Sequence, residues 1–164
     1  MRHHGRVPTP DDPADAQALA GHAATLADAV EAAIPGWVER SVHRVLDAQG
    51  IAVGDELATD LARAGAQARE EGAARVRRML ATDIDEQVGN PLSVLRSLVR
   101  FPTAVLRSAG ARPVPRDEFS ERSFPDDAYD LSPATFADVD PALHEPGLMW
   151  GAAKAHVHLA RRRR

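Results

Sequence analysis

The sequence predicts an all-α protein: an irregular bundle of about five helices, with a long proline-rich acidic strap between the fourth helix and the C-terminal helix. Up to residue 109, apolar residues recur at spacings of three and four, which is typical of helices with one buried face. Proline and glycine separate these segments. A chain of 164 residues is long enough to bury a real core and is expected to form one domain.

The first helix is expected to begin at Asp12 and Pro13, after a mobile leader over residues 1–11. Asp12 can accept hydrogen bonds from the first turn, and Pro13 suits the first helical position. The apolar seam of this helix consists of Ala16, Leu19, Ala23, Leu26, Val30 and Ala33. We expect Pro35 and Gly36 to end the helix, because proline breaks the backbone hydrogen-bond pattern.

A second helix is predicted from Trp37 to Gln49, with Gly50 as its stop signal. A third begins near Asp55 and keeps helical spacing for about seven turns, to Ile84. Its interior glycines, 65 and 72, either allow another helix to approach closely or mark a bend. The sequence Gly89-Asn90-Pro91 predicts a break before the fourth helix.

The fourth helix, residues 91–109, is the most strongly patterned segment of the chain. One half of it is apolar and comprises Leu92, Leu95, Leu98, Val99, Phe101, Val105 and Leu106. Arg96, Arg100 and Arg107 fall on the opposite half, within an arc of roughly 40° on a helical wheel. Pro102 should kink or split the helix. We expect the core to bury the apolar half, because the other helices are rich in alanine.

Residues 110–145 are predicted to form a strap laid across the helices. Four aromatic residues occur in it at intervals of five to seven and are expected to anchor it: Phe119, Phe124, Tyr129 and Phe136. Residues 146–164 are predicted to form the last helix, which ends in an arginine tail. The leader (1–11), the helical body (12–109), the strap (110–145) and the last helix (146–164) are expected to form one domain.

Charge is segregated along the chain, although the net charge is only −4. Residues 91–116 carry five arginines and no acid, and residues 117–146 carry one arginine and nine acids. The absence of cysteine excludes disulfides, cysteine nucleophiles and thiolate metal sites. The N-terminus lacks the apolar run of a signal peptide, and no stretch is apolar enough to span a membrane. We therefore expect a cytoplasmic protein.

Catalytic and metal-binding motifs are absent from the sequence. It contains no GxSxG, no HExxH, no Walker motif and no glycine-rich phosphate loop, so we expect a non-enzyme without a cofactor. An alternative is a metal or enzyme site built from strap acids and histidines, such as zinc held by His144, Glu145 and either His156 or His158. The strap aspartates lack the spacing of a calcium-binding loop.

The candidate binding residues are arginines: Arg96, Arg100, Arg107, Arg161, Arg162, Arg163 and Arg164. They could neutralise the acidic strap, or they could meet an acidic partner groove, an anionic membrane surface or nucleic-acid phosphates. The leading hypothesis is a small non-enzymatic helical binding or adapter protein that engages an acidic protein complex or RNA. A peripheral membrane protein that uses helix 91–109 is the alternative, and a homo-oligomer could form through the alanine-rich helices.

Overall fold

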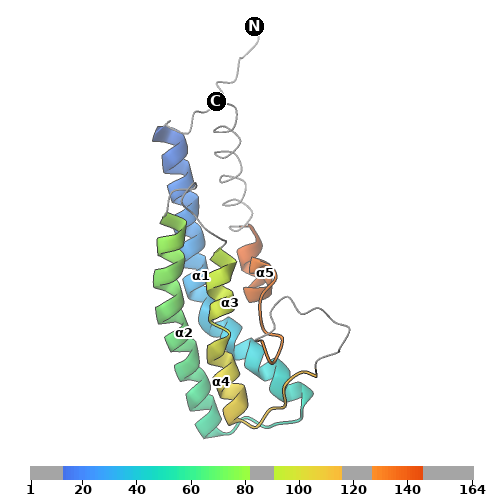
Figure 1. Ribbon diagram of the computed structural model, residues 1–164. Coiled ribbons are helices and arrows are strands. Elements are labelled where there is room, and N and C mark those ends of the chain that lie inside the picture. Colours follow the sequence, from blue (N-terminus) through green and yellow to red (C-terminus); the bar gives the residue numbers. More distant parts are fainter. Residues whose placement is uncertain (1–12, 82–90, 116–126, 146–164) are drawn as a thin grey trace.

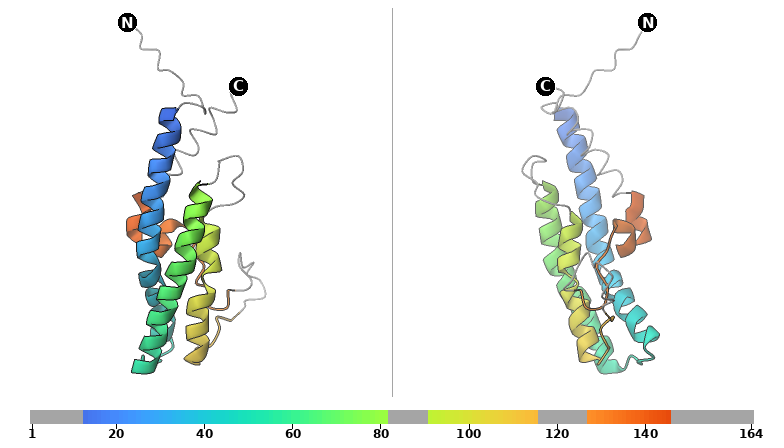
Figure 2. Two further views of the ribbon diagram at one scale, coloured as in Figure 1. Left: turned by 90° about the vertical axis from the view of Figure 1, so that its left-hand side faces the viewer. Right: turned by 45° about the vertical axis from the view of Figure 1, so that its right-hand side comes forward.

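The computed structural model describes residues 13–81, 91–115 and 127–145, and every regular element within these ranges is helical, as the sequence predicts. The elements are α1 (Pro13–Ala48), α2 (Asp55–Ala81), α3 (Pro91–Ser97), α4 (Arg100–Ser108), α5 (Phe136–Val139) and the 3₁₀ helix η1 (Pro141–Leu143). Helices α1 and α2 lie side by side, and α3 and α4 follow each other along the same bundle (Figure 1). In both views of Figure 2, α1 lies between the α3–α4 pair and α5.

Helix α1 continues through Pro35, so the predicted helix end at Pro35 and Gly36 is wrong. A proline in a helix interior removes one backbone hydrogen bond and costs about 3 kcal/mol. The flanking side chains offset this cost, because Ile34, Trp37 and Val38 are all buried in the core. Proline bends a helix that it does not end, and Figure 1 shows α1 changing direction along its length.

Helix α2 contacts its neighbours at both interior glycines, and the close approach that the sequence allowed is found at Gly72. A β-carbon added to Gly65 would lie 3.4 Å from the Pro35 Cα of α1. One added to Gly72 would lie 2.6 Å from a methyl carbon of Leu98 and 2.9 Å from one of Ile34. The structure confirms the predicted third helix from Asp55 to Ala81. Its predicted end at Ile84 lies outside the described residues.

The fourth predicted helix is split, as expected from Pro102. The break lies at Leu98 and Val99, because Pro102 has no N–H to donate to the Leu98 carbonyl. That carbonyl instead accepts a hydrogen bond from the N–H of Phe101 at 3.0 Å, and Thr103 then begins the regular pattern by donating to Val99 at 3.0 Å.

The apolar half of residues 91–109 lies in the core, which confirms the expectation from composition. Six of the seven predicted residues are buried, and Phe101 is half-buried against the core. The buried six are Leu92, Leu95, Leu98, Val99, Val105 and Leu106. The bundle thus fills the space between the alanine-rich helices with the large side chains of α3 and α4.

The described part of the strap, residues 110–115 and 127–145, contributes to the same core. Tyr129 is buried and its hydroxyl donates to the Ala111 carbonyl at 2.8 Å, while Phe136 is half-buried. Aliphatic residues that the aromatic pattern did not single out are buried as well: Leu131, Val139 and Leu143. The other two predicted anchors, Phe119 and Phe124, lie outside the described residues, as do the leader and the predicted last helix.

Candidate partner-binding surface

The three arginines predicted to form one stripe contact different parts of the fold. Arg96 is half-buried, and its Nε donates to the Pro133 carbonyl of the strap at 3.1 Å. Arg100 forms an ion pair with Glu71 of α2 and with no residue in the described part of the strap. Arg107 is exposed in the last turn of α4. The wheel that aligned them assumes one continuous helix, and the break at residues 98–99 removes that continuity.

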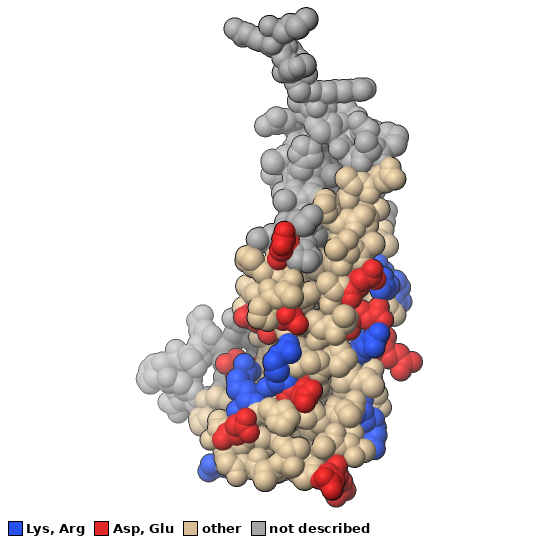
Figure 3. All heavy atoms as spheres, turned by 180° about the vertical axis from the view of Figure 1, so that it is seen from behind, with Lys and Arg blue, Asp and Glu red and all other residues tan. Residues whose placement is uncertain are grey.

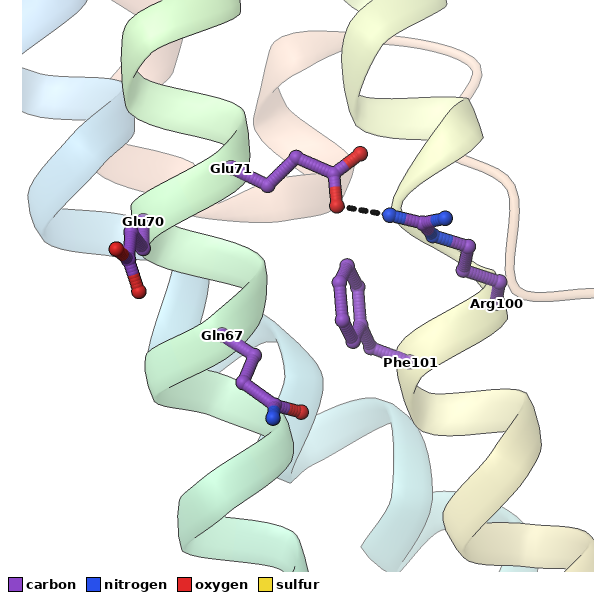
Figure 4. A pocket seen from close by; sticks show the side chains of 5 residues that line it. All are labelled: Gln67, Glu70, Glu71, Arg100 and Phe101. Atoms are coloured by element: carbon purple, nitrogen blue, oxygen red, sulfur yellow. Dashed lines mark hydrogen bonds and ion pairs between the residues drawn. The ribbon is translucent and has the colours of Figure 1, made fainter.

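An open groove of about 680 Å³ lies between α2 and α4. Figure 4 shows the Phe101 ring between the Glu71–Arg100 ion pair and the Gln67 amide. The Arg100 guanidinium carbon lies 4.7 Å from the centre of that ring, a distance at which a cation and an aromatic face attract each other. Arg75 adds to this cluster by pairing with Glu71 at 3.4 Å. Arg100 therefore has two intramolecular partners before any ligand arrives.

A second charged cluster, which the sequence pattern did not predict, joins α1 to α2. Arg77 of α2 reaches Asp28 at 2.6 Å and Glu31 at 2.7 Å, and Arg69 reaches Glu31 at 3.4 Å. Hydrogen bonding from Arg77 lowers the pKa of Glu31 below its ordinary value, and the same bond raises the pKa of Arg77. Figure 3 shows basic and acidic side chains side by side on one face of the molecule. The signal in the sequence that could have indicated this cluster is the spacing of Arg69 and Arg77, which places them about two turns apart in the same helix.

Arginines of α1 hold the strap through its backbone. The Arg40 Nη2 donates to the Val139 carbonyl at 2.6 Å, and the Arg44 Nη2 donates to the Asp130 carbonyl at 3.4 Å. Carboxylates of the strap accept hydrogen bonds from the strap itself: Asp138 from the N–H groups of Ala134 and Thr135, each at 2.8 Å. At Arg40 and Arg44, therefore, the strap is held through its carbonyl oxygens and not through its carboxylates.

Arg107 and Arg112 are the described arginines whose guanidinium groups form neither an ion pair nor a hydrogen bond within the described ranges. Arg112 is not loosely placed, because the Gln49 side chain binds its backbone N–H and carbonyl, each at 2.8 Å. Arg112 was not among the predicted binding residues, and its contact with Gln49 joins positions 63 residues apart. The predicted tail, Arg161 to Arg164, lies outside the described residues.

Among the described residues, no group of three or more histidines and acids could hold a metal ion. His144 and Glu145 are exposed beside η1, whereas His156 and His158 lie outside the described part. No helix in the described ranges is both long and apolar enough to cross a membrane.

No protein-family model, curated protein or solved structure matches the chain.

Proposed function

We propose that this protein is a small, non-enzymatic helical binding protein that engages an acidic protein partner through Arg107 and Arg112. One observation carries the proposal. No acidic residue occurs between Asn90 and Arg116. Within the described part of that stretch, Arg96 and Arg100 have intramolecular partners, whereas the guanidinium groups of Arg107 and Arg112 have none.

The placement of these two arginines suits binding better than folding. Arg107 is exposed in the last turn of α4, so a partner can reach its guanidinium group. The backbone of Arg112 is held by Gln49, which reduces the entropy that a partner would have to remove. Guanidinium groups bind carboxylates through two parallel hydrogen bonds, so an acidic protein surface matches their chemistry. Val114, two residues after Arg112 in the chain, is 41% exposed and adds apolar surface.

Two features favour a protein partner over RNA or a membrane. Nucleic-acid binding depends on the number of phosphates neutralised, and the described surface offers two uncommitted guanidinium groups on a chain with net charge −4. Membrane docking through residues 91–109 would require apolar side chains that are now buried to leave the core. The arginine tail at 161–164 remains a second candidate contact of the same kind.

The proposal is tested by comparing two double variants of equal net charge. Arg107→Ala with Arg112→Ala removes the proposed contact, and Arg63→Ala with Arg69→Ala removes two exposed arginines of α2. Binding of a glutamate-rich peptide is measured by fluorescence anisotropy at low and high salt. We expect the first variant to weaken low-salt binding about tenfold or more and the second to leave it near wild type.

The same titrations with single-stranded RNA and with phosphatidylserine vesicles identify the class of partner. Equal loss in both double variants would show a nonspecific charge effect and contradict the proposal. If RNA or vesicles bind more tightly than the peptide and depend on Arg107 and Arg112 in the same way, the partner is RNA or a membrane and not an acidic protein.

A further inference from the structure

A cleft separates the C-terminal half of α1 from the strap, and neither Arg107 nor Arg112 lines it. Its volume is about 540 Å³, which lies within the usual range for small-molecule sites. Helix α1 contributes Trp37, Arg40, Ser41 and Arg44, and the strap contributes residues 130–134 and Asp138. All of these residues belong to the described part of the chain.

Two positive charges line this cleft one helical turn apart. Arg40 and Arg44 have i, i+4 spacing, which places them on the same face of α1. Each uses one terminal nitrogen to donate to a strap carbonyl, and a guanidinium has five N–H donors in all. Neither arginine forms an ion pair with a carboxylate within the described residues. Most of their hydrogen-bonding capacity and both charges are therefore available to a ligand.

Gly36 provides the room that positions Arg40. A β-carbon at Gly36 would lie 2.9 Å from the Arg40 Nη1, closer than real side chains pack. The Arg40 guanidinium thus lies against the helix surface at Gly36, and a larger residue at position 36 would displace it. An alanine at this position would move the charged group without removing it.

Ser41 supplies a polar group at the same place. The residue is only 5% exposed and lines the cleft, yet its hydroxyl has no hydrogen-bond partner within the described ranges. The hydroxyl oxygen is not one of the buried polar atoms that lack a partner, so solvent reaches it and it can donate a hydrogen bond to a ligand oxygen in the cleft.

The two carboxylates of the cleft are arranged so that they do not exclude an anion. Asp138 accepts two backbone hydrogen bonds from the strap through its Oδ2, and Asp130 is exposed to solvent. Their remaining oxygens can accept hydrogen bonds from hydroxyl groups of a polar ligand. The cleft therefore combines donors for an oxyanion with acceptors for a hydroxylated body.

From this arrangement we propose that the cleft binds a phosphate monoester of a small hydroxylated molecule. A phosphate monoester carries a charge of about −1.5 to −2 near neutral pH, which matches the two guanidinium groups. Arg40 and Arg44 donate to the phosphate oxygens, and the Ser41 hydroxyl donates to a third. The buried Trp37 forms an apolar wall of the site. The site uses neither Arg107 nor Arg112.

The test is isothermal titration of the full chain with glycerol 3-phosphate, with inorganic phosphate and succinate as comparison ligands. We expect glycerol 3-phosphate to bind in the micromolar to millimolar range and succinate to bind more weakly. Gly36→Ala and Ser41→Ala should each weaken binding about tenfold, and Arg44→Ala more. Arg63→Ala with Arg69→Ala is the charge control and should not change the affinity.

Gly36→Ala separates the ligand site from a merely structural role. Alanine is a better helix former than glycine, so this variant should melt close to wild type while losing affinity. No heat of binding up to about 10 mM glycerol 3-phosphate would overturn the proposal. Unchanged affinity in both Gly36→Ala and Ser41→Ala would also overturn it, and tighter binding of succinate would overturn the phosphate assignment.

Discussion

Two glycines in α2 have the same helical conformation but different surroundings. Gly65 faces Pro35 of α1, and an added β-carbon there would make contacts of 3.4–3.6 Å, close to ordinary van der Waals distances. Gly72 faces methyl groups of Leu98 and Ile34, both fully buried, at 2.6 and 2.9 Å. The core around Gly72 has no free space to take up a displaced methyl group. Close packing therefore requires glycine at 72 and only favours it at 65.

The matched substitutions Gly72→Ala and Gly65→Ala test this difference. Gly72→Ala should lower the free energy of unfolding by about 1–3 kcal/mol, because overpacking forces buried side chains out of their preferred rotamers. Gly65→Ala should change it little or raise it by up to about 1 kcal/mol, because alanine is the better helix former. Urea unfolding of both variants measures the two effects. Equal destabilisation would show that the helices also touch too closely at Gly65.

At the scale of elements, the two interior prolines differ in outcome although the local sequence rule is the same for both. Pro102 splits its helix because the Leu98 carbonyl finds another donor, Phe101, in a tight turn. Pro35 does not end α1, because Ile34, Trp37 and Val38 are buried around it on a continuous helix. Tertiary burial can override local propensity. The sequence alone does not show which helix will pack against a proline, so it could not distinguish the two cases.

The contact between α1 and α2 makes a prediction about pH through Glu31. Its pKa is lowered by hydrogen bonding from Arg77, so ionised Glu31 stabilises the folded state. A lowered pKa gives stability that is present above the unfolded value, about 4.3, and lost as the pH falls through the folded value. Glu31→Gln should therefore lower the melting temperature at pH 7, and this gap should narrow toward pH 3.

Glu70→Gln provides the control for that experiment. Glu70 is exposed on α2 and forms no ion pair within the described residues. Its substitution should leave the melting temperature close to wild type at both pH values. Thermal unfolding followed by circular dichroism gives all the values needed. If Glu31→Gln lowered the melting temperature by the same amount at pH 7 and pH 3, the proposed role of the Arg77 contact would be wrong.

At the scale of the whole molecule, the sequence predicted the fold class and the buried faces better than the charge pairing. Apolar spacing located α2, the split helix and its buried half, because periodicity follows directly from helix geometry. Charge blocks suggested that arginines of residues 91–116 face strap acids. Between the helices that the structure describes, ion pairs join α1 to α2 and α2 to α4. Charge along the chain does not determine which helix faces overlap.

The candidate sites show the same limit. Arg107 was predicted from the sequence, but Arg112 depends on a contact with Gln49 that only the folded chain creates. The α1 cleft was not predicted, because Arg40 and Arg44 line a cleft only together with strap residues about 90 positions away in the sequence. Helical spacing alone could have shown that Arg40, Ser41 and Arg44 are neighbours on one helix. It could not have shown that the strap would close over them.

Leu95 decides between the two uses of residues 91–109 for the molecule as a whole. Its side chain is fully buried in the core, so Leu95→Ala should lower the free energy of unfolding by about 2–5 kcal/mol through loss of contacts and cavity formation. Ser93 is exposed on the same helix, and Ser93→Ala should change the stability by no more than about 0.5 kcal/mol. Urea unfolding and binding to phosphatidylserine vesicles are measured for both variants. If Leu95 serves the core, its loss weakens the fold and the folded variant binds vesicles no less than wild type. If Leu95→Ala left the stability unchanged and abolished vesicle binding, the apolar half would serve a membrane and not the core.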